Sequence, residues 1–193
     1  DLRLALFCDS DFAGCKQTAR CTSGVFLALV GPSTFIPLSG VSKRQTSASH
    51  STPEAEIVAA DLGVRTEGLP ALTPWEVLLG RPMQCVLCED NETCIRVLET
   101  RRNPTMRHIG RTHKVDVALL HERFIDGDIC IQATESEYQS ADIFTKSFVL
   151  KEKWAHAREM IATTESLGEA FEAISRGQMC VGNNPTHVYG EVI

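Results

Sequence analysis

Short apolar runs separated by turn residues predict strands in the first part of this chain. Runs rich in Val, Leu and Phe occupy residues 2–8, 22–30 and 34–38, and Gly, Pro and polar residues separate them. Such runs are typical of strands, and three in close succession predict an antiparallel meander. Pro37 predicts an edge position for the third strand, because proline has no N–H for an inner ladder. The polar residues 40–49 that follow are expected to form a loop.

A longer apolar segment with helical start signals comes after this loop. Ser51 or Thr52 can cap a helix, and Pro53 suits its first turn, where a backbone N–H has no helical partner. The apolar positions from Ala55 onward predict a helix that runs to about Thr66. One glycine and two prolines are expected to interrupt the chain after it: Gly68, Pro70 and Pro74.

The rest of the chain alternates strands with helices. Apolar runs predict strands at residues 84–88 and 129–131, and helical patterns cover residues 92–98, 115–124 and 151–161. Another helix is expected to start at residues 141–146. This order predicts an α/β domain with a five-stranded mixed sheet, an antiparallel meander followed by parallel strands, flanked by helices. We expect residues 1–162 to form this domain, and the weakly patterned residues 163–193 to form a weakly structured C-terminal tail.

Composition and net charge limit the size of the core and the kinds of binding site that this chain can have. With 193 residues and 43% apolar content, the chain can bury one domain core. Its net charge of -6 means that any site for a polyanion must be a local basic patch. No apolar run approaches the ~20 residues of a membrane span. The first residues fit a strand and not a signal peptide, and without an initiating Met we expect a piece of a longer protein.

The eight cysteines do not form an obvious framework. Cys85 and Cys88 have the spacing of half a zinc site, but no second pair of cysteines or histidines follows them at the interval that such a site needs. On an extended strand these two side chains point to opposite faces of the sheet. We therefore favour reduced thiols in an intracellular compartment.

Four carboxylates fall at the ends of predicted strands or the starts of predicted helices. They are Asp9, Glu56, Asp90 and Asp142. Such ends can converge on one rim of a sheet, where the carboxylates would repel each other unless a cation joined them. Mg²⁺ and Mn²⁺ are the ions that carboxylate oxygens select, and two such ions ~3.5–4 Å apart are typical of phosphodiester cleavage. Glu54 and Glu56 also have a plainer interpretation, as negative charge at the positive end of a helix.

Residues 101–114 form a basic stretch in an acidic protein. The stretch carries five Arg or Lys and two His, with no acidic residue. A solvated loop is one interpretation, and a phosphate contact surface is the one we favour. Together with two residues of the preceding polar loop, the candidate nucleic-acid contacts are Lys43, Arg44, Arg101, Arg102, Arg107, Arg111, His113 and Lys114.

Seven short motifs occur in an order typical of one family. They are Cys8-Asp-Ser-Asp-Phe-Ala-Gly14, Thr22-Ser-Gly24, Ser42-Lys-Arg-Gln45, Ser51-Thr-Pro-Glu-Ala-Glu56, Cys88-Glu-Asp-Asn91, Arg111-Thr-His-Lys-Val-Asp116 and Ala141-Asp-Ile-Phe-Thr-Lys146. Lys151-Glu-Lys-Trp154 is similar to the family's closing helix. On these motifs, over about residues 3 to 161, the chain resembles the ribonuclease H domain of Copia-type retrotransposon Pol polyproteins, of the retroviral-type ribonuclease H-like family.

The resemblance implies a ribonuclease H-like fold and a metal-dependent reaction. The family's four metal-binding carboxylates match Asp9, Glu56, Asp90 and Asp142, whereas Asp11 and Glu54 are neighbours in the motifs and not ligands. The implied activity is endonucleolytic hydrolysis of the RNA strand of an RNA–DNA hybrid. The implied cofactor is a pair of Mg²⁺ ions, with Mn²⁺ as an alternative, and the products carry 5′-phosphates.

The resemblance also implies a setting. The expected partners are the hybrid itself and a reverse transcriptase domain upstream in the same polyprotein, with no membrane and no small-molecule cofactor. The expected location is a virus-like particle in the cytoplasm, or the nucleus.

Some positions depart from the family's pattern. Phe12 replaces a usual Trp, residues 37–40 replace a Trp-Lys pattern, and Arg111-Thr-His-Lys inverts the usual Lys-His order. These departures leave open an inactive or domesticated module that binds nucleic acid without cutting it, although none of the four carboxylates is lost. Another metal nuclease or transposase on the same fold is a further alternative, since fold does not fix substrate.

Overall fold

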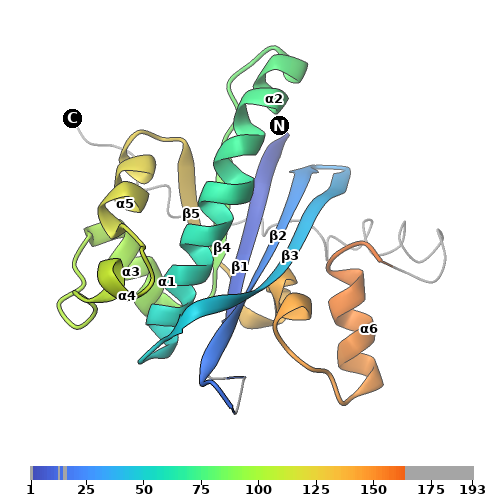
Figure 1. The fold of residues 1–193 in the computed structure, drawn as a ribbon. Coiled ribbons are helices and arrows are strands. Elements are labelled where there is room, and N and C mark those ends of the chain that lie inside the picture. Colours follow the sequence, from blue (N-terminus) through green and yellow to red (C-terminus); the bar gives the residue numbers. More distant parts are fainter. Residues whose placement is uncertain (1, 13, 15–16, 164–193) are drawn as a thin grey trace.

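A five-stranded sheet forms the centre of the molecule in the computed structural model (Figure 1), with strand order β3-β2-β1-β4-β5. The strands are β1 (Arg3–Asp11), β2 (Arg20–Gly31), β3 (Thr34–Ala48), β4 (Cys85–Glu89) and β5 (Ile129–Ala133). The first three pair antiparallel, whereas β4 is parallel to β1 and β5 is parallel to β4. The predicted five-stranded mixed sheet and the edge position of the third strand are therefore confirmed.

The structure describes residues 2–12, 14 and 17–163. Nearly all of the expected tail, from residue 164 to residue 193, lies outside the described residues. No helix in the described part is long and apolar enough to cross a membrane.

The third strand is longer than its apolar run predicted. Residues 40–48, expected as a loop, continue β3 and pair with β2, with Lys43 opposite Ser23 and Arg44 opposite Thr22. At the edge of the sheet this part of the strand is mostly exposed, so it needs few apolar side chains. The apolar pattern therefore missed it, and the two basic residues lie on a strand and not in a loop.

The helix after this strand is also longer than predicted. It consists of α1 (Thr52–Gly63), a π-helical turn η1 (Val64–Gly68) and α2 (Leu69–Leu79), which Figure 1 shows as a nearly continuous rod along the sheet. The expected interruption is wrong, because Pro70 stands in the first turn of α2 after the wider π turn, where its missing N–H costs little. Pro74 lies beyond the first turn, inside α2.

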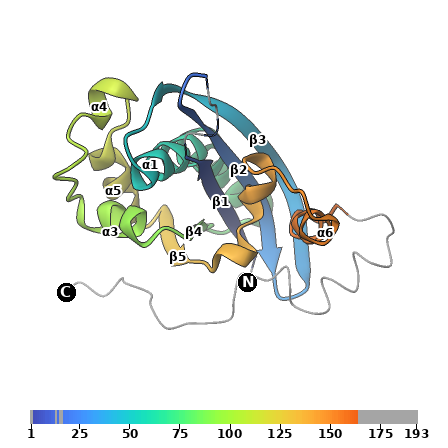
Figure 2. The same cartoon turned by 90° about the horizontal axis from the view of Figure 1, so that it is seen from below.

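The remaining helices cover the two faces of the sheet. They are α3 (Glu92–Thr100), α4 (Ile109–Thr112), α5 (Val117–Ile125), α6 (Lys151–Glu159) and the 3₁₀ turns η2 (Ser136–Tyr138) and η3 (Ser140–Phe144). Figure 2, which looks along the sheet from below, shows α1 and α3 to α5 on one side and η3 with α6 toward the other. The end of the sheet that faces the viewer there carries the start of α1 and also η3.

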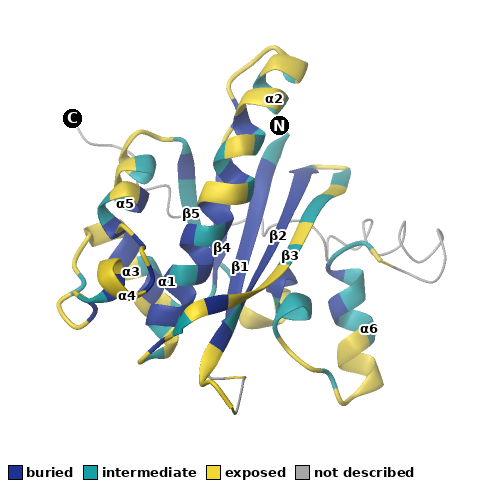
Figure 3. Cartoon of the chain, viewed as in Figure 1, coloured by how far each residue is buried: buried dark blue, intermediate teal, exposed yellow. Residues whose placement is uncertain are grey.

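The core is split between these two faces. Alternate residues of β1 point to opposite sides, so Leu4 and Leu6 pack toward α1 while Ala5 and Phe7 join the smaller cluster with Phe144. The inner strands are buried along most of their length (Figure 3). Cys85 and Cys88 belong to different clusters, as expected for opposite faces of a strand, and both are buried without a disulfide.

Candidate active site

The four predicted carboxylates come from four elements at one end of the sheet. Asp9 lies near the end of β1, Glu56 in the second turn of α1, Asp90 directly after β4, and Asp142 in η3. Because β1 and β4 are parallel, their carboxyl ends share one edge of the sheet. The structure thus brings these residues to one rim, as the sequence predicted.

The turn η3 is held against this rim by two close contacts. The Gln139 side-chain amide donates to the Cys8 carbonyl at 3.0 Å and to the Cys88 carbonyl at 3.3 Å, so it bridges the ends of β1 and β4. Gly24 on β2 lets η3 approach the sheet: a Cβ there would lie 2.6 Å from Thr145 Cγ2 and 2.8 Å from the Ala141 carbonyl oxygen. These contacts set Asp142 beside Asp9.

We predict that Gly24→Ala will push η3 away from the sheet. The added methyl group meets backbone as well as a side chain, so the expected loss of stability is about 1–3 kcal/mol. Urea unfolding measures it, with Gly110→Ala as the control, because a Cβ at that position meets nothing closer than the Val115 carbonyl oxygen at 3.5 Å. Equal stability of the two variants would contradict the close approach.

Lys146 joins two of the carboxylates. Its Nζ lies 2.6 Å from Asp142 Oδ1 and 3.4 Å from Asp9 Oδ1, and the Thr145 hydroxyl donates to Asp9 Oδ2. Burial opposes the charge of the ammonium, but the hydrogen bond to Asp142 and the charge of Asp9 raise the pKa of Lys146 above its ordinary value. Burial also raises the pKa of Asp142 to about 6, against the opposing effect of Lys146. One ammonium therefore compensates two converging carboxylates.

Glu56 is the least compensated group of the site. Its side chain is buried, and Oε2 has no hydrogen-bond partner. Burial, and then the charges of Glu89, Asp9 and Asp90, raise the pKa of Glu56 to about 10. A carboxylate in this position would need a further cation nearby to be ionised at neutral pH.

The sequence analysis did not single out Glu89, which lies in the same environment. It is fully buried at the end of β4, and although Oε1 accepts the Asn91 N–H at 3.1 Å, Oε2 has no partner. Burial raises the pKa of Glu89 to about 8. Strand alternation could have indicated it, because Glu89 follows Cys85 and Leu87 on the face that packs against α1.

We predict that the protein without divalent cations loses stability as the pH rises. The folded state keeps the protons of Glu56 and Glu89 up to pH values near 10 and 8, whereas an unfolded chain releases them at pH ~4.3. The contribution of these two groups to the free energy of unfolding is therefore complete below pH ~4.3 and is lost progressively toward pH 8 to 10. Urea midpoints at pH 5 to 9 with a chelator measure this slope. Glu56→Gln should flatten it, and an unchanged slope in that variant would contradict the assignment.

Asp90 has a partner of its own. The Ser136 hydroxyl donates to Asp90 Oδ2 at 2.6 Å, which ties the end of β4 to η2. Asp90 does not cap α3, since Asn91 is the N-cap and its side chain accepts the Cys94 N–H at 2.9 Å. The neighbouring acid of the first motif, Asp11, accepts the Thr22 N–H and so has a structural partner on β2. Asp90, which caps no helix, stays at the rim and is oriented there by Ser136.

The donors of this rim fit a hard divalent cation in their chemistry. All are carboxylate oxygens, and the buried Glu56 Oε2 lacks a partner. As the side chains lie, the described residues contain no group of three His, Cys, Asp or Glu that could hold a metal ion. The Lys146 ammonium is bound to two of the four carboxylates instead, and a divalent cation would have to replace it there.

Seven of the eight predicted nucleic-acid contacts are exposed. They are Lys43, Arg44, Arg101, Arg102, Arg107, Arg111 and Lys114. The exception is His113, which is buried and contacts Glu54, so it is not offered to a phosphate. Lys43 and Arg44 on the edge strand β3 lie close to the rim. In the sheet, Asp9 pairs with Gly24 and Gly24 pairs with Ser42, and Lys43 is the next residue of β3.

Solved structures of two kinds of protein are similar to this chain in fold. No family model matches the chain. A ribonuclease H1 isolated from compost by a metagenomic approach is similar, with a TM-score of 0.47 and 12% identity over 74% of this chain and 92% of that chain. Ribonuclease H1 from the halophilic archaeon Halobacterium salinarum has a TM-score of 0.45 and 14% identity over 74% of this chain and 94% of that chain.

A third similar structure is the prototype foamy virus protease-reverse transcriptase. Its TM-score is 0.43 and its identity 12%, over 94% of this chain but only 21% of that chain. At identities this low, the site has to be judged from its own geometry.

Proposed function

We propose that this chain is a divalent-metal-dependent endonuclease that hydrolyses the RNA strand of RNA–DNA hybrids. One observation carries the proposal: carboxylates from four elements converge on one rim, around a buried Glu56 whose Oε2 has no partner. Grouping like charges in this way opposes folding, and such arrangements cluster at functional sites. A divalent cation is the partner that would remove the repulsion.

Each residue of the rim has a place in this proposal. Asp9, Glu56, Asp90 and Asp142 would hold two Mg²⁺ ions, with Mn²⁺ as an alternative. When bound, such a pair activates a water and stabilises charge on the leaving 3′-oxygen. Thr145 and Ser136 orient Asp9 and Asp90 through the hydrogen bonds that they donate. The buried Glu89 lies close enough to raise the pKa of Glu56, and its own pKa of about 8 keeps it mostly protonated at neutral pH.

The basic side chains would hold the substrate. The exposed cations of residues 101–114 and of the β3 edge can contact phosphates, which contributes affinity but no sequence preference. A hybrid would be distinguished from duplex DNA by the shape of its groove and by 2′-hydroxyls. This agrees with an enzyme that removes RNA of any sequence.

The motifs extend the proposal to a setting. We place the chain in the Pol polyprotein of a Copia-type retrotransposon, downstream of a reverse transcriptase domain, where it would remove the RNA template after copying. Its location would be a cytoplasmic virus-like particle or the nucleus. The alternative is an inactive or domesticated module that only binds nucleic acid, and only an activity measurement distinguishes it.

A cleavage assay with three labelled substrates tests the function. We expect the protein to cut RNA in an RNA–DNA hybrid with Mg²⁺ or Mn²⁺, and to spare duplex DNA of the same sequence and single-stranded RNA. A chelator should stop the reaction. Equal cutting of duplex DNA would contradict the substrate, whereas binding of the hybrid without cleavage would favour the inactive module.

A further inference from the structure

Glu54 is a buried carboxylate that the proposed reaction does not use. It is 1% exposed, and both of its oxygens are hydrogen-bonded. His108 Nε2 lies 3.2 Å from each oxygen, His113 Nε2 lies 3.3 Å from Oε1, and the His50 backbone N–H donates to Oε2 at 3.1 Å. Two histidines of the basic stretch thus converge on one side chain at the start of α1.

The same histidines are fixed from other sides. The His113 ring is buried, and its Nε2 is also 3.4 Å from the hydroxyl of Ser49. The rings of His50 and His108 meet edge to face with centroids 5.2 Å apart. The Ser47 hydroxyl donates to the Thr112 carbonyl at 2.8 Å, which connects the end of β3 to α4. The basic stretch is therefore attached both to β3 and to α1.

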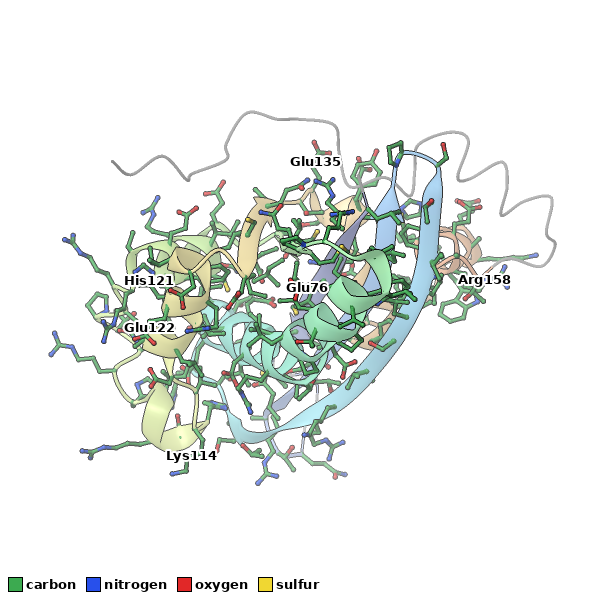
Figure 4. The ribbon with its side chains drawn as sticks, turned by 90° about the horizontal axis from the view of Figure 1, so that it is seen from above. Glu76, Lys114, His121, Glu122, Glu135 and Arg158 are labelled. Carbon is green, nitrogen blue, oxygen red and sulfur yellow. The ribbon has the colours of Figure 1, made fainter. Side chains whose placement is uncertain are left out.

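In the basic stretch, the residues that pack into the fold are different from the residues that carry the exposed charges. Met106, Ile109 and His113 are buried, whereas the five cations are all exposed, and Figure 4 shows Lys114 at the outer edge beside α4. Backbone hydrogen bonds from the His113 N–H to the Ile109 carbonyl and from the Thr112 N–H to the His108 carbonyl form the helical turn of α4 within the stretch. The stretch is therefore anchored to the fold by its buried residues, while its cations face solvent.

We infer that Glu54, with His108 and His113, positions the basic stretch for binding a nucleic-acid backbone, an inference that rests on the proposed substrate. The three side chains form a clamp that fixes the exposed cations relative to α1, the helix that carries Glu56. Phosphate contacts gain affinity when their side chains stand on an ordered backbone, because less entropy is lost on binding. Glu54 is thus a positioning residue and touches neither substrate nor metal.

Glu54→Gln in the full chain tests the clamp. We expect faster hydrogen exchange at the amides of Met106, Ile109 and His113, and about tenfold weaker binding of a fluorescent RNA–DNA hybrid. The KM for the hybrid should rise by a similar factor while kcat changes little, because the carboxylate rim is intact. His108→Ala, a change at a partly exposed position, should reproduce these effects if Glu54→Gln folds poorly.

Glu67→Gln is the matched control, since it removes the same charge from η1, where Glu67 accepts a hydrogen bond from Ser39. It should leave both exchange and affinity unchanged. Unchanged exchange in Glu54→Gln and His108→Ala would overturn the clamp, and faster exchange with wild-type affinity would overturn its role in binding. If the unsubstituted protein binds no hybrid, the proposed function fails and the binding role with it, while the exchange data still show whether the clamp exists.

Discussion

Replacing Asp90 with Asn will abolish hybrid cleavage, with a loss on the order of a thousandfold or more. The change keeps the side-chain volume but removes one carboxylate from the rim. Because Asp90 contributes to the repulsion at Glu56, the protein without divalent cations should be equally or more stable. The increase in melting temperature with millimolar Mg²⁺ should become smaller, since the folded state binds the ion less tightly.

The control for this prediction is Asp11→Asn. Asp11 lies in the same strand as Asp9 but accepts the Thr22 N–H, and an asparagine oxygen can accept it too. Most activity should therefore remain. Melting curves and cleavage rates of both variants, with and without Mg²⁺, test whether Asp90 is needed for metal binding and cleavage. Near-normal hydrolysis by Asp90→Asn would mean that the two-metal mechanism proposed for this rim is wrong.

Which of the two glutamates at the start of α1 faces the site could not be predicted from local sequence. Glu54 and Glu56 stand in the same part of α1, yet residues two apart on a helix point about 200° apart. One therefore meets His108 and His113, and the other meets the carboxylates of the sheet. Only the packing of α1 on the sheet decides which glutamate is which.

The apolar pattern predicted the sheet but not the full length of its edge strand β3. β1 and β2 are buried and carry a clear signal, whereas the exposed half of β3 is polar and reads as a loop. The helical rod was missed at Pro70 for a different reason, since the apolar pattern gives no signal for the π turn that precedes this proline. The contacts of Lys146 with Asp9 likewise join residues far apart in the chain, and only the folded structure shows them.

Lys146→Met should make the protein more dependent on divalent cations. The ammonium is the charge that compensates Asp9 and Asp142, and Asp9 is almost fully buried. Without the ammonium or a metal ion, these carboxylates repel each other, and the expected loss of stability is about 1–3 kcal/mol, since Lys146 is itself partly exposed. Mg²⁺ should restore the loss, and its binding should be about tenfold tighter than in the unsubstituted protein, because no ammonium has to be displaced.

Thermal melts over a Mg²⁺ titration and calorimetric binding constants measure both effects. Lys146→Arg keeps the charge and should retain most of the stability without metal. Lys151→Met removes an equal charge from the exposed start of α6 and should change neither quantity. If Lys146→Met binds Mg²⁺ more weakly than the unsubstituted protein, the ammonium supports the ion and does not compete with it. The ion pairs with Asp9 and Asp142 would then belong to the metal-bound arrangement of the rim.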